Sequence, residues 1–235
     1  MDTINILYTI QHFSQLFGKP SEMPLEQFNN LLGLAQDELF NEFAFGYTSG
    51  NGSDVDDRVV AALAPFRNVH TYSGTSSSTL GVTSRLFQFD TGVVSIDQIW
   101  AYNNSLAYPA KLTKIDKITH QELTERLSNS ITYPSATYPV AVVDKASGAM
   151  QYQCYIVPDT ITSIKAATLD RPTAPQLVLQ VTNGVPVINS STTAPIQFAP
   201  QFHIDIVRIM LKFIGIIVGN PQIQQYVEQE KTLEK

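Results

Sequence analysis

The sequence predicts an α+β protein, in which an antiparallel β-sandwich or partly closed barrel packs with a helical bundle built from both chain termini. Helical spacing of apolar residues dominates residues 3–63 and returns at residues 201–218. Between them, from residue 85 to residue 198, short apolar runs are separated by Gly, Pro, Asn and Ser, which is typical of strands and turns. Helices, then strands, then helices is the order of an α+β fold rather than of alternating βαβ units.

This order divides the chain into three parts. Residues 1–66 form an N-terminal helical part, and residues 67–199 form a β-rich body with one inserted helix near residues 119–128. Residues 200–235 form C-terminal helices that complete the helical part. Joining the two ends makes the helical part discontinuous in sequence.

The N-terminal part contains three expected helices. The first covers residues 3–17, and the second begins near Pro24, because a first-turn proline loses no helical hydrogen bond. A flexible, Gly-, Ser- and Asn-rich break is expected at residues 46–53. Ser53 and Asp56 resemble a capping pair for a short third helix over residues 54–63.

The β-rich body opens with residues 71–84, whose Ser, Thr and Gly content predicts a loop or an exposed edge. Two hairpins are expected. Residues 140–143 pair with 150–157, and residues 177–181 pair with 185–188 around an Asn-Gly turn. Thr119 and Glu122 predict a capping box at the start of the inserted helix.

The C-terminal part consists of a strongly apolar helix, residues 201–218, and a polar last helix, residues 222–235. The last helix has little to bury within its own chain. It nevertheless carries four apolar side chains, namely Ile223, Tyr226, Val227 and Leu233. A terminal helix of this kind either docks on a partner or frays, and the sequence leaves both open.

The charge balance argues against tight nucleic-acid binding. The 235-residue chain is 43% hydrophobic and only 15% charged, with a net charge of −6 and no Lys/Arg run. An acidic surface can still line a channel through which DNA slides, since it repels the phosphates rather than gripping them. A surface with few charges suits broad contact with other proteins, because little charge must be desolvated, but an ordinary Ser/Thr-rich β surface has the same composition.

No motif of catalysis or cofactor binding stands out. Cys154, the single cysteine, lies in an apolar run and is expected to be a buried hydrophobe. The pair His203 and Asp205 is read as a solvated helix start rather than as a ligand pair, and the acidic residues near residue 56 as helix N-terminal charges. We therefore expect no enzyme activity, no cofactor and no metal.

The aromatic residues of the β-rich body leave a binding role open. These are Trp100, Tyr102, Tyr108, Tyr133 and Tyr138. They form either core and cross-strand packing or a platform for a sugar or a base. The alternative function is thus a glycan-binding β-sandwich module.

We expect no association with membranes. The most apolar segment, residues 204–218, contains Asp205, Arg208 and Lys212 and is too short to span a bilayer. The N-terminus has no basic region ahead of its apolar residues, as a signal peptide would have, so synthesis in the cytoplasm is expected.

Three stretches of the chain resemble the neck structural proteins of crAss-like, Bacteroidetes-infecting tailed bacteriophages. The first is a helix at residues 25–42 (LEQFNNLLGLAQDELFNE). The second is the β-rich body with residues 108–109 (YP), 138–141 (YPVA), 155–158 (YIVP) and 169–172 (LDRP). The third is residues 203–207 (HIDIV) with 219–221 (GNP). The regions at residues 46–53 and 71–84 depart most from that pattern.

The resemblance implies a ring-forming connector between the head and the tail of a virion. Identical copies, about twelve by analogy with portals, would close into a ring by head-to-tail contacts. The implied partners are the portal protein, other neck or tail proteins, and DNA that passes through the lumen without sequence-specific binding. The contact candidates between subunits are Phe28, Phe43, Ile223, Tyr226, Val227 and Leu233. Another tail component of a phage remains an alternative.

Overall fold

The structure, a computed structural model, describes residues 3–16, 23–49, 56–103, 112–146, 151–182, 185–189 and 191–218. The chain divides into two compact units. One consists of Met1–Pro65 together with Pro172–Lys235, and we call it the helical unit; the other, Phe66–Arg171, we call the sheet unit. The architecture is α+β, as expected, with five α-helices in the described part of the chain.

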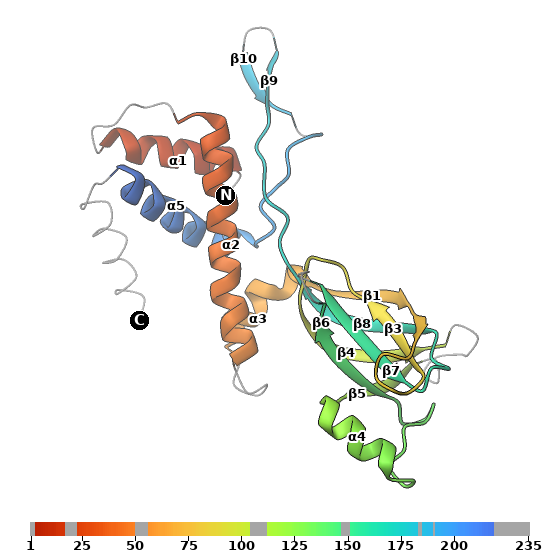
Figure 1. Cartoon of the computed structure of the whole chain (residues 1–235). Helices are drawn as coiled ribbons and strands as arrows, with labels where there is room; N and C mark the ends of the chain where they lie inside the picture. Colours follow the sequence, from red (N-terminus) through yellow and green to blue (C-terminus); the bar gives the residue numbers. More distant parts are fainter. Residues whose placement is uncertain are drawn as a thin grey trace. The chain divides into compact units, whose positions relative to one another are not determined.

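The helical unit contains four of the helices and a separate hairpin (Figure 1). Its elements are α1 (Thr3–Leu16), α2 (Leu25–Ser49), α3 (Asp57–Leu63), β9 (Leu179–Thr182), β10 (Val185–Ile188), the 3₁₀-helix η2 (Pro200–Phe202) and α5 (His203–Val218). Helices α1 and α2 both contact α5, and α2 also contacts α3. Segments from the two ends of the chain therefore share one compact unit.

Helix α2 begins where the sequence predicts. The N–H of Phe28 donates to the carbonyl of Pro24, at 3.0 Å, which closes the first turn around the proline. The apolar stripe of the helix is buried and includes Phe28, Leu32 and Phe40. The expected break at residue 46 is wrong in its position, because α2 continues to Ser49. Tertiary packing of a long amphipathic face outweighs one glycine in a helix.

Helix α3 is capped by Asp56, whose carboxylate accepts from the N–H of Arg58 at 2.9 Å. The expected cap residue Ser53 lies outside the described residues, as do Asn183 and Gly184 of the expected Asn-Gly turn. The hairpin that this turn would join is confirmed, since β9 and β10 pair antiparallel from Leu179–Ile188 to Thr182–Val185.

The sheet unit is built on one eight-stranded sheet in the order β1-β8-β4-β5-β6-β7-β3-β2, which curls into a half-barrel (Figure 1). The strands are β1 (Arg67–Ser73), β2 (Thr75–Ser77), β3 (Ser84–Gln88), β4 (Val93–Tyr102), β5 (Leu112–Lys117), β6 (Val140–Lys145), β7 (Tyr152–Val157) and β8 (Ser163–Asp170). The 3₁₀-helix η1 (Ala64–Phe66) precedes β1.

The expectation of a purely antiparallel sheet is wrong at one place. Strands β5 and β6 pair in parallel, with Asp116 opposite Val140. The connection between them carries α4 (His120–Ser128), and a crossover of this kind lets two neighbouring strands run in the same direction. The predicted capping box of α4 is confirmed: Thr119 accepts from the N–H of Glu122, and Glu122 accepts from the N–H of Thr119.

Gly74 joins the two edges of the large sheet. Strand β1 lies at one edge and β2 at the other, yet this single residue separates them in sequence. A Cβ atom at Gly74 would lie 2.4 Å from Cγ of Arg85 and 2.6 Å from the ring of Phe87. The sheet can curl this tightly only because residue 74 has no side chain. The segment expected as a loop or exposed edge at residues 71–84 thus contains the end of β1 and all of β2, which are the two edge strands.

The interior of the curled sheet is apolar. Its buried residues are Phe87, Phe89, Val93, Ile96, Ile99, Ile115, Ala141, Cys154, Ile156, Ile161, Ile164 and Ala166. All but Phe89 and Ile161 come from the strands, whose side chains point alternately to the two faces of the sheet. Cys154 is completely buried among them, as expected for a small hydrophobe.

Residues 172–199 belong to the helical unit and not to the sheet unit. The sequence-based division placed them in the β-rich body, because β9, β10 and their prolines read as more strands of the same sheet. The two strands in fact form a sheet of their own. Periodicity identifies a strand but not the sheet that it joins.

Candidate protein–protein interface

The segment of residues 172–202 contains no acidic residue, no basic residue and no histidine, and it is the longest such stretch in the chain. It begins directly after the sheet unit, continues through the β9–β10 hairpin and ends with η2. Surfaces without charge lose little hydration energy when another protein covers them. The composition therefore marks this segment as a candidate contact surface.

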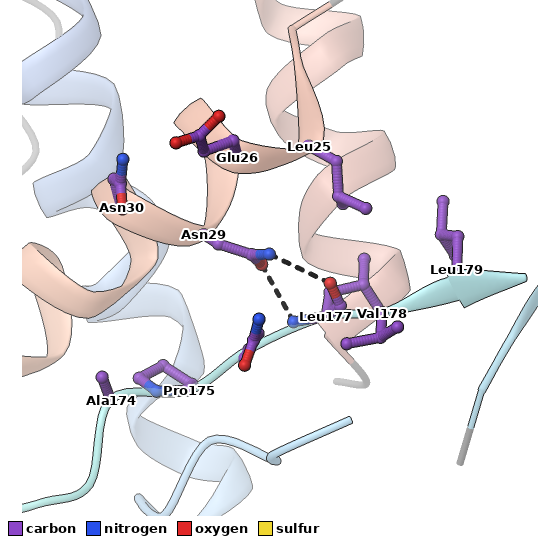
Figure 2. Close-up of a pocket in the computed structure, with 10 residues that line it drawn as sticks. Leu25, Glu26, Asn29, Asn30, Ala174, Pro175, Leu177, Val178 and Leu179 are labelled. Atoms are coloured by element: carbon purple, nitrogen blue, oxygen red, sulfur yellow. Dashed lines mark hydrogen bonds between the residues drawn. The ribbon is translucent and has the colours of Figure 1, made fainter. Parts of the chain in front are cut away.

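Helix α2 holds the first part of this segment through two amide side chains. Gln36, which is fully buried, donates from Nε2 to the carbonyl of Thr173 at 2.8 Å and accepts from the N–H of Gln197 at 3.2 Å. Asn29 accepts from the N–H of Leu177 at 2.9 Å and donates to its carbonyl at 3.0 Å (Figure 2). The Asn29 amide thus pairs with Leu177 as the backbone of a neighbouring strand would.

A groove of about 430 Å³ lies along this contact. It is lined by Leu25, Glu26, Asn29, Asn30 and residues 174–179 (Figure 2). Glu26 is the single charged residue in this lining. The groove is therefore mostly neutral, and it continues the uncharged surface from the segment onto α2.

The hairpin exposes apolar side chains. Val181 is 75% exposed, and Val187 and Ile188 are also exposed. A two-stranded hairpin is marginally stable in water by itself, so apolar side chains on it are stabilised when something covers them. The described part of the helical unit carries further exposed apolar residues at Tyr8, Leu34 and Ile204.

The contact candidates from the sequence lie in different environments. Phe28 is completely buried within α2, so its side chain is already covered by its own chain. Phe43 is half-buried, and its ring lies 5.5 Å from that of Phe202 and 6.3 Å from that of Phe198, centroid to centroid. Ile223, Tyr226, Val227 and Leu233 lie outside the described residues.

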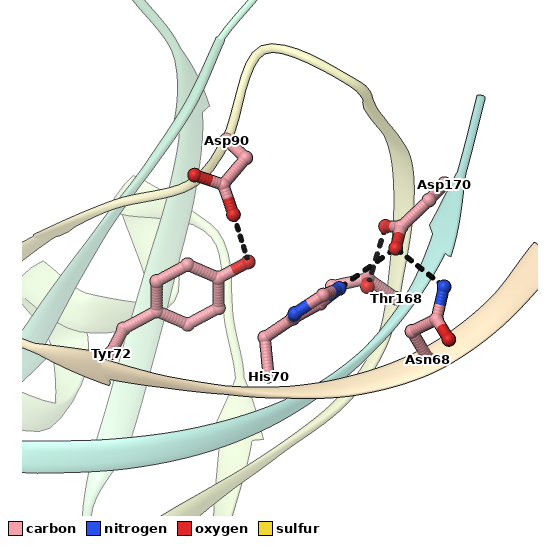
Figure 3. A network of polar contacts seen from close by, with 6 residues as sticks. All are labelled: Asn68, His70, Tyr72, Asp90, Thr168 and Asp170. Carbon is pink, nitrogen blue, oxygen red and sulfur yellow. Dashed lines mark hydrogen bonds and ion pairs between the residues drawn. The ribbon is translucent and has the colours of Figure 1, made fainter. Parts of the chain in front are cut away.

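The sheet unit contains a polar network that ties its edge strand β1 to β8 (Figure 3). Asp170 accepts from Asn68 Nδ2 at 2.8 Å and from Thr168 Oγ1 at 2.8 Å, and its Oδ2 lies 2.7 Å from Nε2 of His70. Nearby, the hydroxyl of Tyr72 donates to Asp90 at 3.3 Å. Each carboxylate is thus engaged by neighbouring donors.

The acid–base properties of this network favour a structural role. Burial would by itself raise the pKa of Asp170, but the hydrogen bonds from His70, Thr168 and Asn68 outweigh it and hold the pKa below its usual value. Burial, together with the carboxylates of Asp90 and Asp170, raises the pKa of the Tyr72 hydroxyl. Asp170 therefore stays ionised and Tyr72 stays protonated, so the network fastens two strands rather than moving a proton.

Four other side chains that could do chemistry, namely Cys154, His203, Asp205 and His120, are also paired or buried. Burial raises the pKa of the Cys154 thiol, which disfavours the thiolate that a nucleophile needs. His203 is buried, with Nε2 2.9 Å from the carbonyl of Phe198, and Asp205 pairs with Arg58 at 3.1 Å. His120 pairs with Asp144 at 2.9 Å on the surface. Among the described residues, no three metal-ligating side chains lie close enough to hold an ion.

The aromatic residues proposed as a platform do not share one environment. Tyr138 is 76% exposed and Tyr133 is exposed as well, both in the connection between α4 and β6. Trp100 and Tyr102 lie half-buried on β4, and Nζ of Lys165 lies 4.6 Å from the centroid of the Tyr102 ring. Tyr108 lies outside the described residues.

Comparison of the chain with models of protein families and with curated protein sequences finds no match. Among the helices of the described residues, none has both the length and the apolar character needed to cross a membrane.

Proposed function

We propose that this chain is a virion structural protein, a subunit of a neck ring that connects the portal to the tail of a tailed bacteriophage. The observation that carries the proposal is the charge-free segment of residues 172–202, which presents the exposed hairpin and lines a groove in which Glu26 is the single charged residue. A surface of this kind is suited to lasting contact with other proteins. The resemblance of residues 25–42 and of the motifs at residues 108–109, 138–141, 155–158 and 169–172 to crAss-like neck proteins supports the neck as its location.

In this proposal the helical unit is the part that contacts neighbours. The helices from both ends of the chain would form one bundle, and the contacts of α5 with α1 and α2 support this. The exposed Tyr8, Leu34 and Ile204 of these helices would face adjacent copies or the portal. The sheet unit buries its own apolar cluster, so this proposal assigns it no contact with neighbours.

The net charge of −6 fits a subunit that surrounds DNA without gripping it. A ring of about twelve copies needs head-to-tail contacts that close after one turn. The purified chain is therefore expected to form such rings, alone or together with the portal protein of its virus. Mass photometry of the chain with and without the portal protein checks this. A chain that stays monomeric in both conditions contradicts the proposal.

The residues at the C-terminus give a second test of the same proposal. If residues 222–235 dock on a neighbouring virion protein through Ile223, Tyr226, Val227 and Leu233, then deleting them lowers ring yield in the same measurement. The control replaces the four apolar residues with serine in the full-length chain, which should give the same loss. Unchanged ring assembly in both variants rules out docking by this segment.

The exposed Tyr133 and Tyr138 are the basis for a second candidate function, the binding of glycans by a platform of aromatic rings. A glycan array separates the two functions. The neck-ring proposal predicts no bound glycan, whereas reproducible binding that is lost in the variant Tyr138→Ala supports the alternative.

A further inference from the structure

We propose that the outer edge of β9 pairs with the same edge of a second copy of this chain, which joins two hairpins into one antiparallel sheet. Such a contact is two-fold symmetric, so it differs from the head-to-tail contacts that close a ring. The inference therefore goes beyond the proposed function, and an experiment can contradict either proposal without contradicting the other.

The direction of the backbone groups in the hairpin follows from Pro186. This residue pairs with Val181 across the hairpin. Proline has no N–H, so the pair cannot exchange two hydrogen bonds and must be of the non-hydrogen-bonded type. Because the two types alternate along an antiparallel pair, Leu179 and Ile188 also form a non-hydrogen-bonded pair. The N–H and carbonyl groups of Leu179 and Val181 therefore point outward, away from β10.

Two observed contacts agree with this alternation. The N–H of Asn189 donates to the carbonyl of Val178 at 2.9 Å, so the groups of Val178 point toward the β10 side. The groups of Leu177 point to the opposite side, where they meet the amide of Asn29 at 2.9 and 3.0 Å (Figure 2). Leu177, Leu179 and Val181 thus share one edge. Asn29 covers its first position, and no backbone partner among the described residues covers the next two.

This open edge is complementary to itself. When two copies of β9 run antiparallel about an axis at Gln180, Leu179 of one copy lies opposite Val181 of the other. Both residues point their N–H and carbonyl groups toward the partner strand, so the two residues exchange two hydrogen bonds. The two-fold symmetry gives the same two hydrogen bonds between Val181 of the first copy and Leu179 of the second. The next position along the edge is Leu177, where Asn29 already occupies the backbone groups and ends the pairing. The edge of β10 is a poorer match, because Pro186 offers no outward N–H.

The charge distribution favours a second copy as the occupant. A two-fold contact brings each residue close to its own counterpart, so any charge near the axis would repel itself. Residues 172–202 contain no charge at all. On one face of the joined sheet, Leu179 and the exposed Val181 and Ile188 of both copies lie together. The contact is small, so we expect a reversible dimer with a Kd of about 10–100 μM.

Sedimentation velocity over a range of concentrations tests the pairing with the full-length chain. The variant Val181→Pro removes the outward N–H without removing a hydrogen bond within the hairpin. It is expected to weaken dimerisation by more than about tenfold. The matched variant Val181→Ala shortens the same side chain but keeps the N–H, and it should weaken dimerisation by much less.

Cysteine cross-linking tests the register and does not depend on a proline being tolerated. Gln180 and Thr182 are both exposed and lie on the same face of β9. In the proposed register Gln180 faces its counterpart in a non-hydrogen-bonded pair, with Cα atoms about 4.5 Å apart, which is within the range of a disulfide. Two Thr182 residues would lie about 13 Å apart. Mild oxidation should therefore link Gln180→Cys at least about tenfold faster than Thr182→Cys; the native Cys154 is buried.

The inference is overturned if no dimer forms up to about 500 μM, far above the expected Kd. It is also overturned if Val181→Pro and Val181→Ala dimerise equally, or if both cysteine variants link at the same rate. A ring whose size and yield Val181→Pro leaves unchanged, with no cross-linking through residue 180, contradicts the pairing while supporting the proposed function. Cross-linking through residue 180 in a chain that forms no ring supports the pairing and contradicts the proposed function.

Discussion

The sheet edges of the two units are built in opposite ways. In the sheet unit, one edge strand, β1, carries Arg67 and His70, and the other, β2, is only three residues long. Charges and short edge strands both discourage pairing with another protein. The β9 edge of the helical unit is also short, at four residues, but it carries no charge, and its Val181 is exposed. This difference in charge is consistent with the proposed pairing of the hairpin, and it gives no such support to pairing at β1.

The largest expected effect tests which side chains are already covered within the chain. Phe28→Ala removes a fully buried ring from α2, so it should lower the free energy of unfolding by about 3–5 kcal/mol. Leu34→Ala is the control on the same helix, because Leu34 is 57% exposed and its loss should change this energy by less than about 0.5 kcal/mol. Urea denaturation measures both. If Phe28→Ala left stability unchanged and only impaired assembly, the result would support Phe28 as a contact between subunits, as the sequence suggested.

The next effect concerns the closure of the large sheet. Gly74→Ala places a Cβ against Arg85 and the buried ring of Phe87, and the overlap should lower stability by about 1–3 kcal/mol. Gly92→Ala is the matched control, since nothing lies within 4 Å of a Cβ at that position. Thermal and chemical unfolding give the comparison. Equal stability of the two variants would show that the sheet does not depend on Gly74 for its curvature.

A smaller effect is expected where α2 holds the start of β9. Asn29→Ala removes the two hydrogen bonds to Leu177 and should lower stability by about 1–2 kcal/mol. It also frees one more position on the β9 edge, so association of the hairpins should not weaken. Denaturation and sedimentation velocity of the same sample separate the two effects. A variant with normal stability but lost association would contradict the assignment of Asn29 as the end of the open edge.

The smallest effect is a dependence on pH in the sheet unit. The folded-state pKa of Asp170 lies below the ordinary value of 3.8, so this carboxylate adds stability above pH 3.8. That stability is lost as the pH falls from 3.8 through the folded-state pKa. Thr168→Val removes one of the three donors and should make the pH dependence shallower. Unfolding of both proteins at several acidic pH values is the measurement, and identical pH profiles would contradict the role of the network.

Local signals in the sequence predicted much of the fold. The capping pair Thr119 and Glu122, the proline at the start of α2 and the hairpin around residues 182–185 all depend on neighbouring residues, and the structure has each of them. The parallel pairing of β5 with β6 and the closure at Gly74 depend on residues far apart in sequence, which periodicity does not report. The same limit explains why residues 172–199 were placed in the β-rich body, although β9 and β10 form a sheet of their own.

The candidate interface was missed although one signal for it is present in the sequence. The absence of charge over residues 172–202 can be read directly from the sequence, whereas strand-like periodicity predicts only a hairpin of the β-rich body there. The open edge itself could not be read, because it depends on Asn29, which contacts Leu177 across a separation of 148 residues. Phe28, which the sequence suggested as a contact between subunits, is buried within its own chain. An apolar stripe on a helix does not tell which residues cover it.

The central claim is that this protein acts through surfaces that it offers to other virion proteins. A cryo-EM map of the neck of the virion that contains it tests this most directly. The account predicts a closed ring of this chain between portal and tail, with the helical unit in contact with neighbouring subunits. Density for the chain in the capsid shell or at a fibre tip, or its absence from the particle, would contradict the account.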